Sequence, residues 1–361
     1  MKSCLKIRFD RSNSTYIAGE TITGHISVQN SQKTQKALEN GIVVTWSGKQ
    51  HVYWETHKPT AAEKRVGPLP KKKLPGDRPC ETDTINYFQT TQILTDYVDT
   101  KTHSEYPFLF KIPVECVPNV KGKYGGIAYW VTVRFSDSVK EIAKGFNVLP
   151  SLDRPFCSNF VNLSPCKLVQ GESGAIFKDG SFSMQISLPK RHFIRGETLS
   201  TTVTFTNSST KPITNFTIQL IQRIHYHSNQ KLPICQDQTF RNCQLYRNLR
   251  RNEKIMVMEQ KFPLKIEPGQ SFEDQFQFEI PKKSIPTFES SLISVGYFLS
   301  FFSKTSSIFS KIQANLGISI GSKPKVAEKL LVPQLEELSC SFSSPPPSYH
   351  SDCPSFHEKI E

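Results

Sequence analysis

One short stretch of the chain occurs twice. Residues Tyr16-Ile17-Ala18-Gly19-Glu20-Thr21-Ile22-Thr23 return as Phe193-Ile194-Arg195-Gly196-Glu197-Thr198-Leu199-Ser200, at an offset of 177 residues. In each copy a glycine, which adopts backbone conformations that other residues resist, is followed by a glutamate and an alternating run. The stretch predicts a tight turn that leads into a β-strand, and the two glutamates are interpreted as structural rather than catalytic.

A second block repeats in the same order. Phe108-Leu109-Phe110-Lys111-Ile112-Pro113 returns as Phe276-Gln277-Phe278-Glu279-Ile280-Pro281 at an offset of 168, and Tyr129 is matched by Tyr297 at that same offset. Each copy is an alternating strand that ends at a proline, which cannot donate to a sheet. Two collinear blocks indicate a duplicated domain.

Strand signals dominate the whole sequence. Apolar residues alternate with polar ones in the strands predicted at Leu5, Ile7 and Phe9 and at Ile127, Tyr129, Val131, Val133 and Phe135, and further strand signals cover Ile42 to Trp46 and Val52 to Glu55. Successive side chains of a strand point to opposite faces, so each run has one face to bury. The pattern predicts an all-β protein with two stacked antiparallel sheets in each domain. Trp46, Trp54 and Trp130 are expected in the core.

Proline-rich and polar segments set the predicted domain limits. We predict an N-terminal β-sandwich over 1–150, a linker over 151–163, a C-terminal β-sandwich over 164–321 and a disordered tail over 322–361. The N-terminus has no apolar run after its charges, so no signal peptide is predicted. The nine cysteines are then expected to be reduced thiols of a cytosolic protein.

The net charge of +13 favours acidic partners. Basic residues cluster around Lys71, Lys72 and Lys73 and around Arg250 and Arg251, which are candidate sites for an acidic partner or an anionic lipid. The alternative interpretation is two solvated loops. No nucleic-acid-binding pattern is present, so nucleic acid is not an expected partner.

No motif indicates catalysis. The sequence lacks a nucleophile elbow, a phosphate-binding glycine loop and a zinc-protease motif, so an enzyme is the least favoured class and no cofactor is expected. His225 and His227, followed by Cys235 and Cys243, could form a metal cluster, but their spacing fits no strong pattern. We interpret them as ordinary packing or surface residues and predict no metal site.

The tail carries the exception, the sequence Pro345-Pro346-Pro347-Ser348-Tyr349. Successive prolines pre-set the extended polyproline II conformation, which loses little entropy on docking into an aromatic groove. Pro-Pro-x-Tyr is the form that WW domains bind. From the 24 prolines and 11 tyrosines of the chain, chance predicts about 0.05 occurrences.

Together these features resemble the α-arrestins, the arrestin-domain-containing proteins. The resemblance spans nearly the whole chain and rests on the two repeated blocks, on Gly48 with Trp54, and on the terminal Pro-Pro-Ser-Tyr. It implies two Ig-like β-sandwiches in a cytoplasmic adaptor that works at the plasma membrane and endosomes. Such adaptors bind membrane-protein cargo and recruit HECT-type E3 ubiquitin ligases, here through Pro345, Pro346, Pro347 and Tyr349, so that cargo is ubiquitinated, endocytosed and sorted.

The sequence also leaves alternatives. Many α-arrestins carry two Pro-Pro-x-Tyr motifs and this chain carries one, so it lacks the avidity of a double motif. A second hypothesis is therefore a ligase-independent scaffold or endosomal sorting subunit that acts through sandwich surfaces and a basic loop. A third is a lipid- or acid-binding module built on Lys71, Lys72 and Lys73.

Overall fold

The computed structural model divides into two compact units, residues 1–323 and residues 324–361. It describes residues 5–29, 31, 34, 38, 40–56, 80–99, 103–150, 166–172, 180–228, 243, 249–305 and 311–322. The linker predicted over 151–163 and the tail beyond Ser322 lie outside these ranges, so the predicted domain limits stay predictions. In the part of the chain that is described, no helix is long and apolar enough to cross a membrane.

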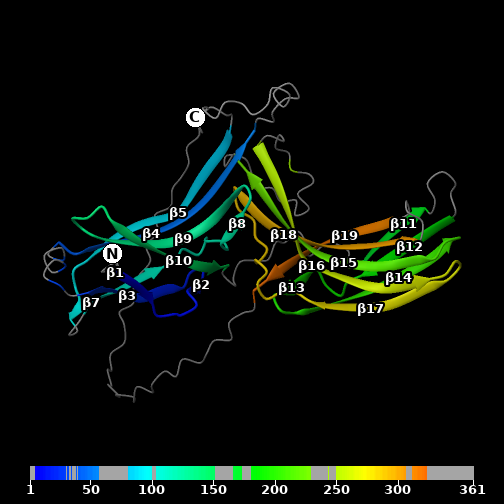
Figure 1. Ribbon diagram of the computed structural model, residues 1–361, viewed down its shortest axis with the longest axis horizontal. Coiled ribbons are helices and arrows are strands. Elements are labelled where there is room, and N and C mark those ends of the chain that lie inside the picture. The colour runs from blue at the N-terminus through cyan, green and yellow to red at the C-terminus, as the bar shows by residue number, and fades with distance from the viewer. Residues whose placement is uncertain are drawn as a thin grey trace, which may run out of the picture. The chain divides into compact units, whose positions relative to one another are not determined.

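The first half of the chain forms two sheets (Figure 1). Their strands are β1 (Leu5–Phe9), β2 (Thr15–Ile17), β3 (Thr21–Gln29), β4 (Ile42–Glu55), β5 (Cys80–Leu94), β6 (Val98–Asp99), β7 (His103–Lys111), β8 (Val120–Gly122), β9 (Gly125–Phe135) and β10 (Glu141–Leu149). One sheet has the order β1-β3-β7-β6 and the other β2-β10-β9-β4-β5, with β8 paired to β9. All neighbours are antiparallel except β2 and β10.

The second half repeats this plan. Its strands are β11 (Cys166–Glu172), β12 (Gly180–Ser187), β13 (His192–Ile194), β14 (Thr198–Ser209), β15 (Ile213–His227), β16 (Arg250–Ile266), β17 (Ser271–Glu279), β18 (Ile293–Thr305) and β19 (Lys311–Gly321). They form sheets of order β11-β12-β14-β17 and β13-β19-β18-β15-β16, again with one parallel pair, β13 and β19. The predicted all-β architecture of two sandwiches is confirmed.

The buried faces follow the alternation of the sequence. Leu5, Ile7 and Phe9 are buried on β1 while the residues between them are exposed. On β9, Ile127, Tyr129, Val131 and Val133 are buried and Phe135 is half-buried against the core. This one-sided burial is what an antiparallel sheet with one solvated face requires.

The tryptophans behave mostly as predicted. Trp46 is fully buried and stacks on Phe110 with ring centroids 4.7 Å apart, and Trp54 is also buried. Trp130, expected in the core, is only half-buried, because it lies on the alternate face of β9.

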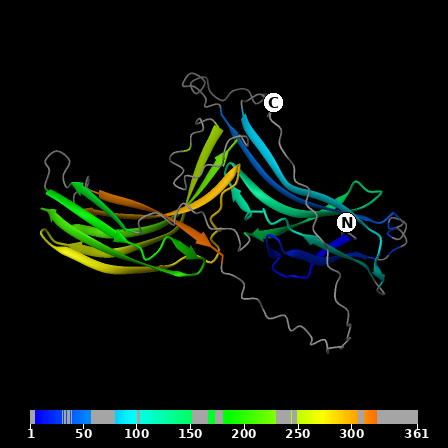
Figure 2. The ribbon, with the colours of Figure 1, turned by 180° about the vertical axis from the view of Figure 1, so that it is seen from behind.

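The two strand signals around Gly48 belong to one strand. β4 runs without interruption from Ile42 to Glu55, and its pairing with β5 shifts register between Gly48 and Lys49. A β-bulge absorbs an extra residue without ending the strand, which explains why two short runs form one long strand. The hairpins β4–β5 and β15–β16 each extend past the other strands of their own sheet in both views (Figures 1 and 2).

The repeated turns are clasped in the same way. The Gly19 N–H donates to the Ile112 carbonyl at 3.0 Å, and the Gly196 N–H donates to the Ile280 carbonyl at 2.8 Å. Both glycines have positive φ, +93° and +78°, where a Cβ would be strained. The 177-residue and 168-residue repeats therefore meet in space at equivalent hydrogen bonds.

The conserved plan extends to the repeated tyrosines of the two halves. The Tyr129 hydroxyl donates to the Val117 carbonyl at 2.9 Å, and the Tyr297 hydroxyl donates to the Ile285 carbonyl at 2.7 Å. Val117 and Ile285 are separated by the same 168 residues as the tyrosines. Each buried hydroxyl is thereby satisfied, as a buried polar group must be.

Candidate functional site: the junction of the two sandwiches

A single carboxylate joins the two sandwiches. Oε2 of Glu253, on β16, accepts a hydrogen bond from the Tyr226 hydroxyl at 2.6 Å and another from the Lys123 backbone N–H at 2.8 Å. The Tyr124 ring meets the Tyr226 ring edge-on, with centroids 5.6 Å apart. Burial, and then the bond to Glu253, raise the pKa of Tyr226, so the hydroxyl stays a donor. The β8–β9 turn is thus held against β15 and β16.

The junction leaves no room at Gly122. A Cβ built on this glycine would lie 1.9 Å from the Tyr226 hydroxyl oxygen. Tyr226 is fully buried and hydrogen-bonded, so it cannot give way without loss. Glycine at position 122 is therefore required by close approach.

A second pair of contacts crosses the junction at Gln50. This side chain is 1% exposed, donates to the Ser290 hydroxyl at 2.8 Å and accepts from the Tyr87 hydroxyl at 3.1 Å. A buried amide with both ends satisfied fixes orientation as well as stabilising the contact.

Arg250 and Arg251, which the sequence singles out as candidate anion-binding residues, lie at the start of β16. The Arg251 guanidinium sits over the Trp54 ring, 5.3 Å from its centroid, and the Arg250 side chain donates to the Cys243 carbonyl. Cation–π contact and hydrogen bonding give both side chains an intramolecular role. Binding of an acidic partner or lipid at these arginines stays a prediction.

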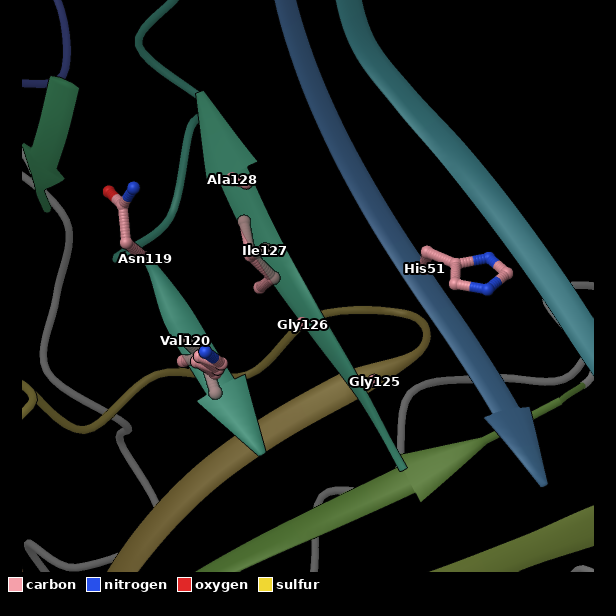
Figure 3. Close-up of a pocket in the computed structure, with 8 residues that line it drawn as sticks. His51, Asn119, Val120, Gly125, Gly126, Ile127 and Ala128 are labelled. Atoms are coloured by element: carbon pink, nitrogen blue, oxygen red, sulfur yellow. The ribbon is translucent and has the colours of Figure 1, made fainter. Parts of the chain in front are cut away.

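One cavity lies beside the β8–β9 turn, with a volume of about 560 Å³ (Figure 3). Its lining is mostly backbone and small side chains, and the His51 ring points away from Ile127 toward β5, where it bonds to Thr84 at 2.8 Å. The cavity therefore has little chemistry with which to select a charged ligand.

A second cavity, of about 350 Å³, lies between the sandwiches and is basic. The second sandwich supplies Arg195, Lys282, Lys283 and Ser284 to its wall. The remaining lining residues are Thr15, Pro118, Asn119, Asn147, Val148, Leu149, Ile285 and Pro286. No lining residue is acidic, so the cavity suits an anion.

Two polar atoms of this wall have no partner among the described residues. They are Nε of Arg195 and the hydroxyl oxygen of Ser284, both buried. Burial lowers the pKa of Arg195, an effect that Tyr297 opposes. Even so, an arginine stays charged at neutral pH. Unsatisfied buried donors beside exposed lysines are what a carboxylate or phosphate group would pair with.

Sequence reasoning missed this cavity, although the repeat held a signal. The first copy of the turn has Ala18 where the second has Arg195. A charged residue in place of a buried alanine marks the position where the two sandwiches differ in function.

Comparison with protein families identifies both halves. Residues 5–154 match the description "Arrestin (or S-antigen), N-terminal domain", and residues 178–325 match "Arrestin (or S-antigen), C-terminal domain". The chain belongs to the arrestin family. No curated protein matches it. Arrestin domains indicate a role of the trafficking-adaptor type, and arrestin-family proteins are generally non-enzymatic adaptors that bind membrane receptors as cargo.

Other predicted sites of this arrestin-family chain are not among the described residues. Pro345, Pro346, Pro347 and Tyr349, proposed to bind a WW domain, and Lys71, Lys72 and Lys73, proposed to bind acidic partners, fall in undescribed ranges. The α-arrestin subtype and these sites stay predictions.

The histidines of the possible metal cluster come together with one cysteine. His225 Nε2 lies 2.6 Å from His227 Nε2, which in turn lies 3.4 Å from the Cys243 sulfur. Burial lowers the pKa of His225 to about 3 and also lowers that of His227, so both rings are neutral at neutral pH. Cys235, the other cysteine of that pattern, lies outside the described residues.

Proposed function

We propose that this arrestin-family protein is a cytoplasmic adaptor for membrane-protein cargo at the plasma membrane and endosomes. Its sandwiches bind the cargo, and Pro345 to Tyr349 recruits a WW-domain HECT-type E3 ubiquitin ligase. The observation that supports this most is the combination within one chain of two arrestin domains and a single Pro-Pro-Ser-Tyr after them. The expected outcome is cargo ubiquitination, endocytosis and sorting.

The mechanism is tethering. Cargo and ligase bound to one chain meet at a high effective concentration, so ubiquitin transfer needs no catalytic group from the adaptor. Pro346 and Pro347 stack in the aromatic groove of the WW domain, Tyr349 fills a second pocket, and Pro345 extends the polyproline II helix. A single motif gives no avidity, which makes docking readily reversible.

The basic cavity is the proposed cargo contact. Arg195, Lys282 and Lys283 surround a space of about 350 Å³, and the chain carries a net charge of +13. These charges attract an acidic cytoplasmic segment of the cargo and orient it as it approaches. The unpaired Arg195 Nε and Ser284 hydroxyl then offer direct hydrogen bonds to a carboxylate or phosphate oxygen.

The ligase half of the proposal is tested with peptides of residues 339–361. We expect the natural peptide to bind WW domains of HECT-type ligases and Tyr349→Ala to bind at least about tenfold more weakly, because the tyrosine pocket is left empty. Phe356→Ala, outside the motif, is the matched control and should bind as the natural peptide does. Equal, weak binding of the natural and Tyr349→Ala peptides would falsify ligase recruitment by this motif.

The same change in cells separates adaptor from scaffold. In the full chain, Tyr349→Ala should abolish ligase proximity and reduce cargo ubiquitination while cargo binding persists. If cargo sorting is unchanged by Tyr349→Ala and by deletion of residues 339–361, the protein is instead a ligase-independent arrestin scaffold.

A further inference from the structure

Three metal-ligating side chains gather in the second sandwich. His225 and His227 are two residues apart near the end of β15, where alternate residues share a face, and Cys243 comes from the segment that leads to β16. Their ligating atoms all lie within 4.8 Å of one another. The three residues are 1%, 3% and 8% exposed. Side chains from separate segments thus converge on one buried point.

The distances suit a small tetrahedral ion. Nitrogen ligands at about 2.0–2.1 Å and a thiolate at about 2.3 Å from Zn²⁺ lie roughly 3.3–3.6 Å from each other. The His227 Nε2 to Cys243 sulfur distance is 3.4 Å, and the two Nε2 atoms, at 2.6 Å, need to separate by only a fraction of an ångström. Two imidazoles and a thiolate form a ligand set that favours Zn²⁺ over Mg²⁺ or Ca²⁺.

The surrounding hydrogen bonds orient both rings as ligands. His225 Nδ1 lies 2.7 Å from Asn252 Oδ1, which accepts its proton. His227 has a backbone hydrogen bond with Ser291 that acts to raise its pKa, the effect of a carbonyl that accepts from the ring. Zinc-bound histidines usually donate their second N–H to such an oxygen. With both Nδ1 protons used in this way, the two Nε2 lone pairs face each other, a repulsive arrangement that a cation relieves.

We infer that His225, His227 and Cys243 bind one Zn²⁺ through two Nε2 atoms and a thiolate. The Cys243 thiol loses its proton to solvent when the metal binds. Three protein ligands leave a fourth coordination position for water or another donor. The adjacent Arg250, whose side chain donates to the Cys243 carbonyl, favours the thiolate form.

Such an ion would stabilise the junction. Asn252 orients His225, and it is flanked on β16 by Arg251 and Glu253, which contact the first sandwich. Zinc would fix Cys243 to the end of β15 and so hold this edge in place. Binding free energy of a structural metal becomes folding free energy of the site around it.

Metal analysis of the full chain, purified without chelator, is the test. We expect about one zinc per chain, falling to less than about a tenth in Cys243→Ala and in His227→Ala, because two ligands do not retain the ion. Cys80→Ser, at an exposed free cysteine, is the matched control and should keep its zinc. Far-UV circular dichroism checks that each variant retains its β-structure.

Cobalt substitution supplies a readout that survives a misfolded variant. After zinc is removed, Co²⁺ added to the wild-type chain should give a thiolate-to-cobalt charge-transfer band, which Cys80→Ser retains and Cys243→Ser lacks. The inference is overturned if the wild-type chain holds no zinc and gives no such band, or if Cys243→Ala keeps its zinc. Copper in place of zinc at the same stoichiometry would overturn the identity of the metal.

Discussion

At the scale of the residue, the repeated glutamates close the turns. Glu20 Oε2 accepts from the Ile17 N–H at 2.8 Å, and Glu197 Oε2 accepts from the Ile194 N–H at 2.7 Å. Each carboxylate also holds a cation, Arg11 at 2.7 Å and Lys190 at 2.5 Å. The cations do not follow the repeat, since the 177-residue offset of Arg11 falls on Leu188. The sequence therefore indicated the glutamates and not their partners.

The Glu197 clasp predicts a pH dependence of stability. Burial alone would raise the pKa of this carboxyl, but hydrogen bonds from Lys190 and the Ile194 N–H outweigh it and hold the pKa below its usual 4.5. In the window between the two pKa values the unfolded chain binds more protons, so stability rises with pH. The contribution is present above about pH 4.5 and is lost as pH falls through the folded pKa.

Glu197→Gln should consequently destabilise the chain by about 1 kcal/mol at pH 7, since it removes the charge but keeps an acceptor for Ile194. The difference from wild type should vanish toward pH 3. Denaturant unfolding at several pH values measures it, with the exposed Glu141→Gln as control. A difference that stays constant from pH 7 to pH 3 would assign the clasp no ionic component.

At the scale of the element, the β8–β9 hairpin is fixed by what it touches. The strand from Ile127 onward was predicted from its alternation, whereas the three-residue β8 and its turn carry no such pattern. Contacts of this hairpin with Tyr226 and Glu253 join residues more than a hundred positions apart. Such contacts are invisible to any local window.

Gly122→Ala should destabilise the chain by about 1–3 kcal/mol, the typical cost of overpacking a tight site. Its methyl group displaces the Tyr226 hydroxyl and breaks the bond to Glu253. In a Tyr226→Phe background the cost should be smaller, because the hydroxyl that clashes is gone. Gly145→Ala, whose Cβ would meet its nearest atom at 3.7 Å, is the control and should be much milder. Equal costs of Gly122→Ala in both backgrounds would rule out the clash.

At the scale of the whole molecule, duplication produced two sandwiches whose junction is not repeated. Arg195 occupies the place of Ala18, and Lys282 and Lys283 line the same basic cavity. Only the assembled pair of sandwiches brings these residues opposite Pro118 and Asn147 of the first half. The proposed separation is that this cavity binds cargo and the distant tail binds the ligase.

Charge reversal of Lys282 and Lys283 to glutamate should reduce labelling of membrane-protein cargo several-fold in a cellular proximity assay, because an acidic segment is then repelled. Ligase labelling through Tyr349 should be unchanged. Lys6→Glu with Lys140→Glu, exposed residues outside the cavity lining, makes the same change of net charge and serves as the control. If both pairs reduce cargo labelling equally, net charge and not the cavity is responsible.

The sequence by itself determined the strands, the duplication and the all-β sandwich architecture. Period-two alternation and turn glycines such as Gly19 and Gly196 act over a few neighbouring residues, so they can be read locally. The same locality gave the Pro-Pro-Ser-Tyr segment, whose chemistry needs only five consecutive residues.

The tertiary structure decided what lies at the junction and around Cys243. Two histidines on one strand have no evident ligand partner until the fold returns a cysteine to them, and Arg195 is one more basic residue until Lys282 arrives beside it. The physical reason is that a site is defined by distances between side chains. Those distances are set by long-range packing of strands, which no spacing along the chain encodes.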